Sequence, residues 1–289
     1  MSSGSLHSSG LFNVAGKVVL VTGGSRGIGK MIAAGFVANG CKVYISSRSA
    51  KDCDLAAEEL NALGPGSCAA LPADMQKYEE VERLVHTLSA REQALHVLVN
   101  NAGAAWGETI DDYPVSSQFG CDTAFTKLLT LNTQRVFTLT QKCLPLLRAA
   151  ATRGGMEGDV YKDPARIINI GSVDGLVVPS LETYAYSASK AALHHLSRHL
   201  ASRLGWDGIT SNTIACGPFQ SKMMAATLQS MGDAIKSRIP LLRIGAPEDV
   251  AGTAIFLASR AGAYVNGATI TLDGGQTIAM RPMSHSAKL

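Results

Sequence analysis

The chain of 289 residues lacks several features that mark particular protein classes. It has no apolar run near the ~20 residues that a membrane-spanning helix needs. The polar N-terminus, MSSGSLHSSG, has no apolar segment typical of a secretory signal. Its net charge is only +3, without a basic stripe or zinc-finger spacing. We therefore expect a protein that neither spans a membrane nor binds nucleic acid.

The chain has few cysteines, and their spacing matches no known metal-binding or disulfide motif. The six cysteines form no CxxC motif and no Cys/His cluster, so we predict reduced thiols and no metal site. Charged residues make up only 17% of the chain and hydrophobic residues 46%, which allows a sizeable core.

Seven short apolar runs alternate with helical patterns along the chain. The runs lie at 17–24, 42–47, 68–73, 95–103, 165–172, 209–215 and 268–275. They are continuous rather than alternating, as expected for strands covered on both faces. This predicts a single α/β domain, doubly wound and Rossmann-type, with a seven-stranded parallel sheet, helices on both faces and right-handed crossovers.

The sequence also indicates the limits of this domain and its less regular parts. We predict the domain at 14–278, between a flexible tail at 1–13 and another at 279–289. Long helical patterns cover 118–149 and 183–204, and looser segments cover 150–164 and 217–243.

The stretch VTGGSRGIGK joins the first strand to the first helix. Its Gly23, Gly27 and Gly29 do not have the common G-x-G-x-x-G spacing. Glycines nevertheless let the backbone approach a pyrophosphate, and the helix N-terminus supplies free N–H groups. The stretch therefore predicts a dinucleotide site.

The end of the second strand predicts which dinucleotide binds. An NAD enzyme places an acid about 20 residues beyond the glycines, against the ribose 2′-hydroxyl. Here Ser46, Ser47 and Arg48 occupy that place, and Arg26 lies in the glycine loop. Arginine binds a 2′-phosphate by charge-assisted hydrogen bonds, so we predict NADP(H).

In YAYSASK, Tyr186 and Lys190 share one helix face because they are four residues apart. A nearby cation lowers the pKa of a phenol from about 10, which suits Tyr186 to proton transfer. Tyr184 has alanine at the corresponding position, so we assign it to packing or to the pocket rim.

Five motifs in order, TGGSRGIG, NNAG (100–103), INIGSVDG (168–175), YSASK (186–190) and LDGG (272–275), resemble the short-chain dehydrogenase/reductase family. The local sequence around these motifs is similar to that of NADPH-dependent β-ketoacyl reductases and tropinone reductases. The resemblance implies a catalytic tetrad: Asn132 holding a water, Ser172 bonding the substrate carbonyl, Tyr186 transferring the proton, and Lys190 holding the nicotinamide ribose.

The resemblance also implies a set of cofactor contacts. They are Gly23, Ser25, Arg26, Gly27, Ile28, Gly29, Ser47, Arg48, Asp74, Met75, Asn101, Ala102, Gly103, Tyr186, Lys190, Gly217 and Ser221. One position departs from the family pattern: Cys216 stands where proline is usual, as a space-filling residue or a reactive thiol.

The segments that usually form the substrate pocket are apolar and offer no charged anchor: Trp106, Leu176, Val177, Phe219, Met223 and Met224. We expect an NADPH-dependent carbonyl reductase acting on a lipophilic ketone or a β-ketoacyl thioester. The alternatives are an enoyl- or dienoyl-CoA reductase and a non-catalytic NADP-binding protein.

Assembly and location are also expectations. By resemblance the two long helices build a homo-oligomer, which we expect to be a tetramer, although a dimer remains an alternative. The final Ala287-Lys288-Leu289 is a variant of the Ser-Lys-Leu peroxisomal address, so we expect the peroxisomal import receptor as a partner, with cytosol as the alternative.

Overall fold

The computed structural model describes residues 6–114 and 123–279. Seven parallel strands form one sheet in the order β3-β2-β1-β4-β7-β8-β9, which confirms the predicted doubly wound fold. The strands are β1 (Val18–Thr22), β2 (Lys42–Ser46), β3 (Ser67–Ala70), β4 (Val97–Asn100), β7 (Ala165–Ile170), β8 (Ile209–Cys216) and β9 (Thr269–Leu272).

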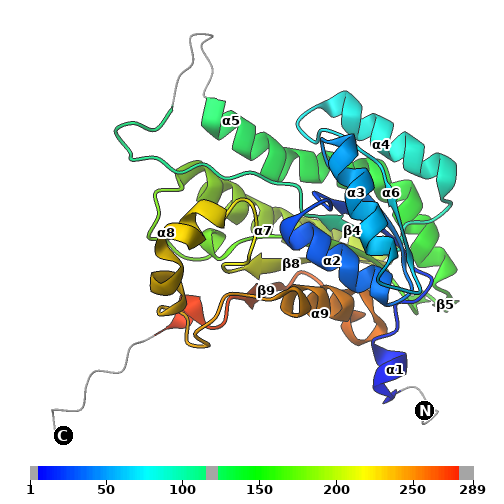
Figure 1. Cartoon of the computed structure of the whole chain (residues 1–289). Coiled ribbons are helices and arrows are strands. Elements are labelled where there is room, and N and C mark those ends of the chain that lie inside the picture. Colours follow the sequence, from blue (N-terminus) through cyan, green and yellow to red (C-terminus); the bar gives the residue numbers. More distant parts are fainter. Residues whose placement is uncertain (1–5, 115–122, 280–289) are drawn as a thin grey trace, which may run out of the picture.

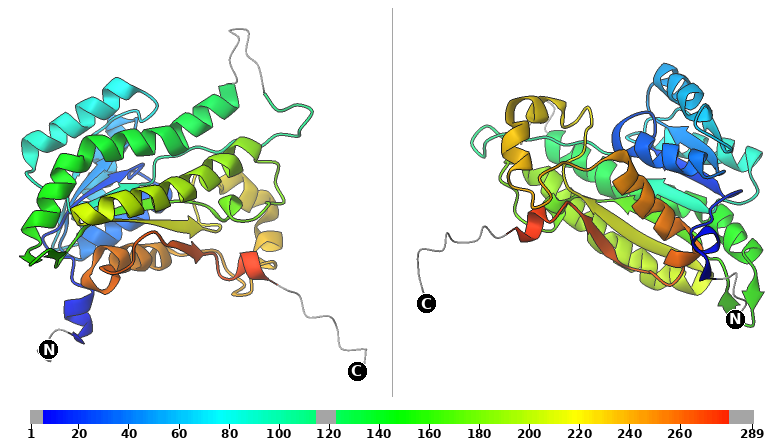
Figure 2. Two further views of the ribbon diagram at one scale, coloured as in Figure 1. Left: turned by 180° about the vertical axis from the view of Figure 1, so that it is seen from behind. Right: turned by 60° about the horizontal axis from the view of Figure 1, so that its bottom comes forward.

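Helices cover both faces of this sheet (Figures 1 and 2). They are α1 (Ser8–Leu11), α2 (Gly27–Ala38), α3 (Ala50–Asn61), α4 (Tyr78–Arg91), α5 (Thr123–Leu129), α6 (Arg135–Arg153), α7 (Tyr184–Leu204), α8 (Ala225–Lys236) and α9 (Pro247–Ala258). A π-helical turn, Thr130–Gln134, joins α5 to α6, so the described part of the predicted helix 118–149 is almost continuous.

Alternate residues of β1 point into two separate cores. Val19 and Val21 pack with α2, α3 and α9, whereas Leu20 packs with α4, α6 and α7. Because both faces of β1 are buried in this way, its residues are apolar except Thr22, whose hydroxyl is hydrogen-bonded. This explains why the sequence of β1 is a continuous apolar run. All residues of β7 and β8 are buried as well, but these strands also contain polar residues, such as Asn169 and Asn212, whose side chains are hydrogen-bonded.

Two predicted irregular segments contain regular structure. Within 150–164, α6 continues to Arg153 and a short hairpin follows, formed by β5 (Met156–Glu157) and β6 (Val160–Tyr161). Within 217–243 lies α8. In the predicted tail 1–13, Ser8–Leu11 form one helical turn, and the Phe12 ring lies 6.5 Å from that of Phe256. Packing of an aromatic ring explains this last difference.

The sheet order determines where a ligand can bind. β1 has β2 on one side and β4 on the other, so the crossovers after β1 and β4 leave in opposite directions. A crevice opens at such a switch point, beyond the carboxyl ends of the strands. The loops after β1, β2, β4, β7 and β8 all contribute residues to one cleft of about 2090 Å³.

Candidate active site

The glycine turn after β1 forms the nucleotide end of the cleft. Gly23 and Gly27 have φ of +66° and +54°, in the left-handed region that favours glycine. Gly29 is buried rather than lining the cleft, and a side chain there would collide with Gly23 and Asn101. The backbone of this turn therefore packs closely against its neighbours, which requires glycine at these positions.

The first turn of α2 suits an anion. Arg26 is the N-cap residue, and no side chain caps the helix. The first N–H groups of a helix have no partner within the helix, and they carry partial positive charge. Because Gly23, Ser25 and Gly27 line the cleft beside these groups, the turn fits a pyrophosphate.

Arg26, Ser47 and Arg48 line the same end of the cleft. Neither arginine forms a salt bridge within the ranges that the structure describes. Both guanidinium groups are thus available to a phosphate, and the arrangement fits a dinucleotide with a 2′-phosphate. Asp52 also lines this end, on the first turn of α3.

Most of the other predicted cofactor residues also line the cleft: Ile28, Asp74, Met75, Asn101, Ala102, Gly103, Gly217 and Ser221. Asn101 ties β4 to β1, because its side-chain amide donates to the Thr22 carbonyl over 2.9 Å. The cofactor contact of Asp74 stays a prediction.

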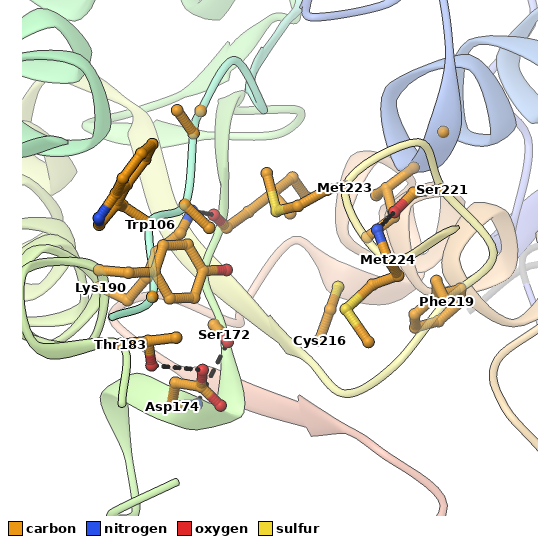
Figure 3. Close-up of a pocket in the computed structure, with 18 of the residues that line it drawn as sticks. Trp106, Ser172, Asp174, Thr183, Lys190, Cys216, Phe219, Ser221, Met223 and Met224 are labelled. Atoms are coloured by element: carbon orange, nitrogen blue, oxygen red, sulfur yellow. Dashed lines mark hydrogen bonds between the residues drawn. The ribbon is translucent and has the colours of Figure 1, made fainter. Parts of the chain in front are cut away.

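Ser172, Tyr186 and Lys190 meet where the loops after β7 and β8 approach α7. Figure 3 shows Ser172 and Lys190 at this place. The Ser172 Oγ accepts the Asp174 N–H over 3.2 Å, which leaves the Ser172 O–H free to donate to a substrate oxygen. Lys190 is 5% exposed, and its Nζ donates to the Ile170 carbonyl over 2.7 Å. This Nζ lies 5.6 Å from the centroid of the Tyr186 ring.

The pKa of Tyr186 differs from the expectation. Burial raises the pKa of this phenol above its ordinary value, although the nearby Ser172 hydroxyl lowers it and the Asp174 charge raises it. The Lys190 ammonium is not among the groups that shift the pKa of Tyr186, and burial lowers its own pKa to about 8. Tyr186 is therefore a protonated donor at neutral pH.

Asn132 lies in the π-helical turn, 1% exposed, behind the cleft. Its Nδ2 donates to the Ala104 carbonyl and to Ser189 Oγ, each over 2.9 Å, and its Oδ1 accepts the Ala104 N–H over 3.0 Å. The side chain thus holds the loop after β4 against α7. A water held by Asn132 stays a prediction.

Tyr184 is separated from this chemistry. Its ring packs edge-on against Tyr113 at 5.5 Å, and its hydroxyl donates to Glu182 over 2.8 Å. Cys216 lines the cleft, but burial raises the pKa of its thiol to about 12, so the thiol stays protonated and fills space.

The substrate end differs in two ways from the expected apolar pocket. Five of the expected apolar residues line it: Trp106, Val177, Phe219, Met223 and Met224. Leu176 does not, because the 3₁₀ turn after Ser172 directs Val177 and Val178 into the cleft instead. The expectation of no charged anchor was wrong: Asp174, Glu108 and Glu182 also line the cleft.

Sequence reasoning also missed His194. This side chain is 4% exposed, and its Nε2 accepts the Ser172 N–H over 3.4 Å. A side chain at Gly171 would collide with its ring. Burial lowers its pKa to about 4, so the ring is neutral and remains an acceptor. Its position four residues after Lys190 was the available signal.

The segment that forms the outer wall of the substrate end is closed at its base. The Gly245 N–H donates to the Pro218 carbonyl over 2.9 Å, and Phe219 pairs with Gly245. The Phe219 ring, 2% exposed, fills the space that a side chain at Gly245 would need. We refer to this contact as the neck of segment 219–245.

Comparison with known proteins agrees with this geometry. A family model described as enoyl-(acyl carrier protein) reductase matches residues 23–277. The rhamnolipids biosynthesis 3-oxoacyl-[acyl-carrier-protein] reductase of Pseudomonas aeruginosa is 43% identical, covering 91% of this chain and 97% of that protein. A tropinone reductase homolog of Arabidopsis thaliana is 31% identical, covering 94% and 98%.

The chain belongs to the short-chain dehydrogenase/reductase family. A solved structure of P. aeruginosa RhlG in an active-site complex with NADP superposes with a TM-score of 0.83. It is 42% identical, and the match covers 92% of this chain and 98% of that one. Within the described ranges, no helix is long and apolar enough to cross a membrane, and no group of metal-ligating side chains gathers.

Proposed function

We propose that the protein is an NADPH-dependent carbonyl reductase, with Tyr186 as general acid, that reduces a lipophilic ketone or a β-ketoacyl thioester. The observation that carries the proposal is the meeting of Ser172, Tyr186 and Lys190 at one end of a cleft whose other end fits a 2′-phosphorylated dinucleotide. The 3-oxoacyl reductase and the NADP complex among its relatives support the same chemistry.

NADP(H) is the cofactor. Gly23, Ser25 and Gly27, with the first turn of α2, would hold its pyrophosphate, and Arg26 and Arg48 would hold its 2′-phosphate. When bound in its reduced form, it supplies a hydride to the carbonyl carbon.

The protein's own residues handle the oxygen of the carbonyl. Ser172 donates its free O–H to this oxygen, which stabilises the negative charge that develops there. Tyr186, protonated because burial raises its pKa, delivers the proton. Lys190 lies beside the phenol and, by the family resemblance, holds the nicotinamide ribose.

The test follows NADPH absorbance with a panel of cyclic ketones and β-ketoacyl thioesters, with enoyl thioesters as the comparison. Oxidation of NADPH by at least one carbonyl substrate is expected. Turnover of enoyl thioesters alone would replace the proposal with the enoyl-reductase alternative, and turnover of nothing would favour a non-catalytic NADP-binding protein.

We also propose a homotetramer. The α7 residue Leu193 packs inside the subunit, 1% exposed, so it offers no surface to a second copy. Leu129 and Phe137, on α5 and α6, are 38% and 44% exposed and offer apolar surface on the neighbouring helices. A monomeric mass by light scattering at micromolar concentration contradicts this assembly.

Peroxisomal import is a further proposal, supported by the C-terminal sequence alone. Ala287-Lys288-Leu289 lie outside the described residues. The test fuses a fluorescent protein to the N-terminus and compares the full chain with one lacking 287–289 in a eukaryotic host. Punctate fluorescence that needs the tripeptide is expected, and diffuse fluorescence from both rejects the proposal.

A further inference from the structure

Asp174 introduces a carboxylate into the substrate end of the cleft. Its backbone N–H bonds Ser172 Oγ, so the residue is attached directly to the catalytic serine. Thr183 Oγ1 donates to Asp174 Oδ2 over 3.4 Å, and Figure 3 shows both bonds. The side chain is half-buried and lines the cleft. These two contacts place Asp174 beside Ser172.

The protein leaves this carboxylate largely unpaired. No lysine, arginine or histidine within the described ranges lies within 4.0 Å of it. The neighbouring ammonium of Lys190 is bonded to Ile170. A carboxylate can accept about four hydrogen bonds, and Thr183 supplies one long bond. Burying a charge with so few partners is unfavourable, so a donor from the substrate stabilises it.

The wall around Asp174 has the same charge sign. Glu108 and Glu182 line the cleft on this side, whereas Lys222 and Arg238 line it from segment 219–245. Segments 104–113 and 172–184, which contribute these three acids, contain no lysine and no arginine. Like charges across a contact disfavour binding, so this wall disfavours a carboxylate or phosphate near the reacting carbonyl.

We propose that Asp174 is a specificity-determining residue that selects an uncharged ketone bearing a hydroxyl group, over its apolar and its anionic equivalents. This inference rests on the proposed carbonyl reduction and narrows its substrate class. The hydroxyl donates to a free oxygen of Asp174 while the ketone oxygen accepts from Ser172 and Tyr186. An apolar group in the same place leaves the carboxylate without a partner, and an anionic group is repelled.

The experiment compares kcat/KM within matched pairs of ketones. The first pairs are 4-hydroxycyclohexanone with 4-methylcyclohexanone and the two 3-substituted equivalents. The second pair is 4-oxocyclohexanecarboxylate with its methyl ester. For the unchanged protein we expect the hydroxy ketone to exceed its methyl partner by about tenfold or more in at least one of the pairs, because a polar site rejects a partner that cannot bond it.

Three variants separate shape, charge and hydrogen bonding. Asp174→Leu should reverse the hydroxyl preference. Asp174→Asn keeps an acceptor oxygen and should keep the preference, while raising the rate with the carboxylate ketone. Glu182→Gln removes a carboxylate from the same wall and should leave the hydroxyl-to-methyl ratio unchanged. An equal ratio in the unchanged protein and Asp174→Leu overturns the inference.

A binding measurement distinguishes this inference from the proposed function. Calorimetry on the NADP⁺ complex compares cyclohexane-1,4-diol with 4-methylcyclohexanol, for the unchanged protein, Asp174→Leu and Asp174→Ala. Preference for the diol that both substitutions abolish supports the role of Asp174 even if no ketone is turned over, in which case only the proposed function fails. No preference for the diol overturns the inference, whatever the turnover.

Discussion

The nucleotide end and the substrate end of the cleft are built differently. The nucleotide end is formed by short turns directly after strands, with glycines at positive φ and with arginines free to bind phosphate. The substrate end is formed by the longer segments 104–113, 172–184 and 219–245. The first two of these carry carboxylates, and the third carries Lys222 and Arg238. The contrast explains why a sequence motif identified the cofactor, whereas the substrate needed three-dimensional structure.

Changing Tyr186 should separate the two ends most strongly. Tyr186→Phe removes the proton donor, which typically lowers kcat by about 10²–10⁴-fold, while NADPH still binds. Tyr184→Phe, the matched control two residues away, should leave kcat almost unchanged because its hydroxyl bonds only Glu182 among the described residues. Steady-state kinetics and NADPH fluorescence titration measure both effects. Loss of activity in Tyr184→Phe instead would contradict the assigned roles.

Changing Arg48 should affect only the nucleotide end. We expect the unchanged protein to prefer NADPH over NADH by at least about tenfold in kcat/KM, about 1.4 kcal/mol. Arg48→Asp should reverse this preference, since a carboxylate repels the 2′-phosphate and bonds a ribose hydroxyl. Arg91→Asp, the same charge change at the end of α4, is the control. Equal kcat/KM values for the two cofactors in the unchanged protein would be incompatible with a 2′-phosphate site.

His194 positions Ser172, which lies between the two ends of the cleft, by accepting its backbone N–H. His194→Leu removes the acceptor of the Ser172 N–H, so we expect kcat to fall by about tenfold, the equivalent of one hydrogen bond of about 1.4 kcal/mol. His194→Gln, which can present an oxygen, should restore part of the loss. The exposed neighbour His195, changed to Leu, serves as the control. An unchanged kcat in His194→Leu, with the fold intact by circular dichroism, would remove this positioning role.

The smallest effect concerns pH. Burial lowers the pKa of Lys190 to about 8, so the ammonium is charged below that pH and neutral above it. Ketone reduction should therefore decline by a few-fold as pH rises through about 8, measured as kcat/KM at saturating NADPH. Lys190→Arg, which stays charged, should be slower at every pH but should lack this decline. The same decline in Lys190→Arg would assign it to another group.

Most of the fold was predictable because its signals are local. Central strands such as β1 and β4 are buried on both faces, so they appear as continuous apolar runs, and all seven predicted strands lie in the sheet. The two-residue strands β5 and β6 were not, since two residues carry no periodicity. The turn at Ser8–Leu11 depends on packing of Phe12 with a distant ring, which no local pattern contains.

In the site, too, the features with a local sequence signal were predictable and those that depend on tertiary structure were not. The spacing of Tyr186 and Lys190 follows from helix geometry, and the structure brings both to the cleft. Asp174 lies in a 3₁₀ turn, whose direction has no sequence period, so its entry into the pocket could not be predicted, nor could the exclusion of Leu176. The raised pKa of Tyr186 depends on the depth of burial, which the helical spacing does not give.

Because of the neck, segment 219–245 can be exchanged as a unit, and with it the outer wall of the substrate end. Its two ends already meet at the contact between Pro218, Phe219 and Gly245, so a change in the length of the chain between them does not require these ends to move apart. Lengthening a loop whose ends are joined costs little, about 0.6 kcal/mol for each doubling. An engineer could therefore graft a different wall at this neck and change what enters the cleft, while leaving the strands and the tetrad as they are.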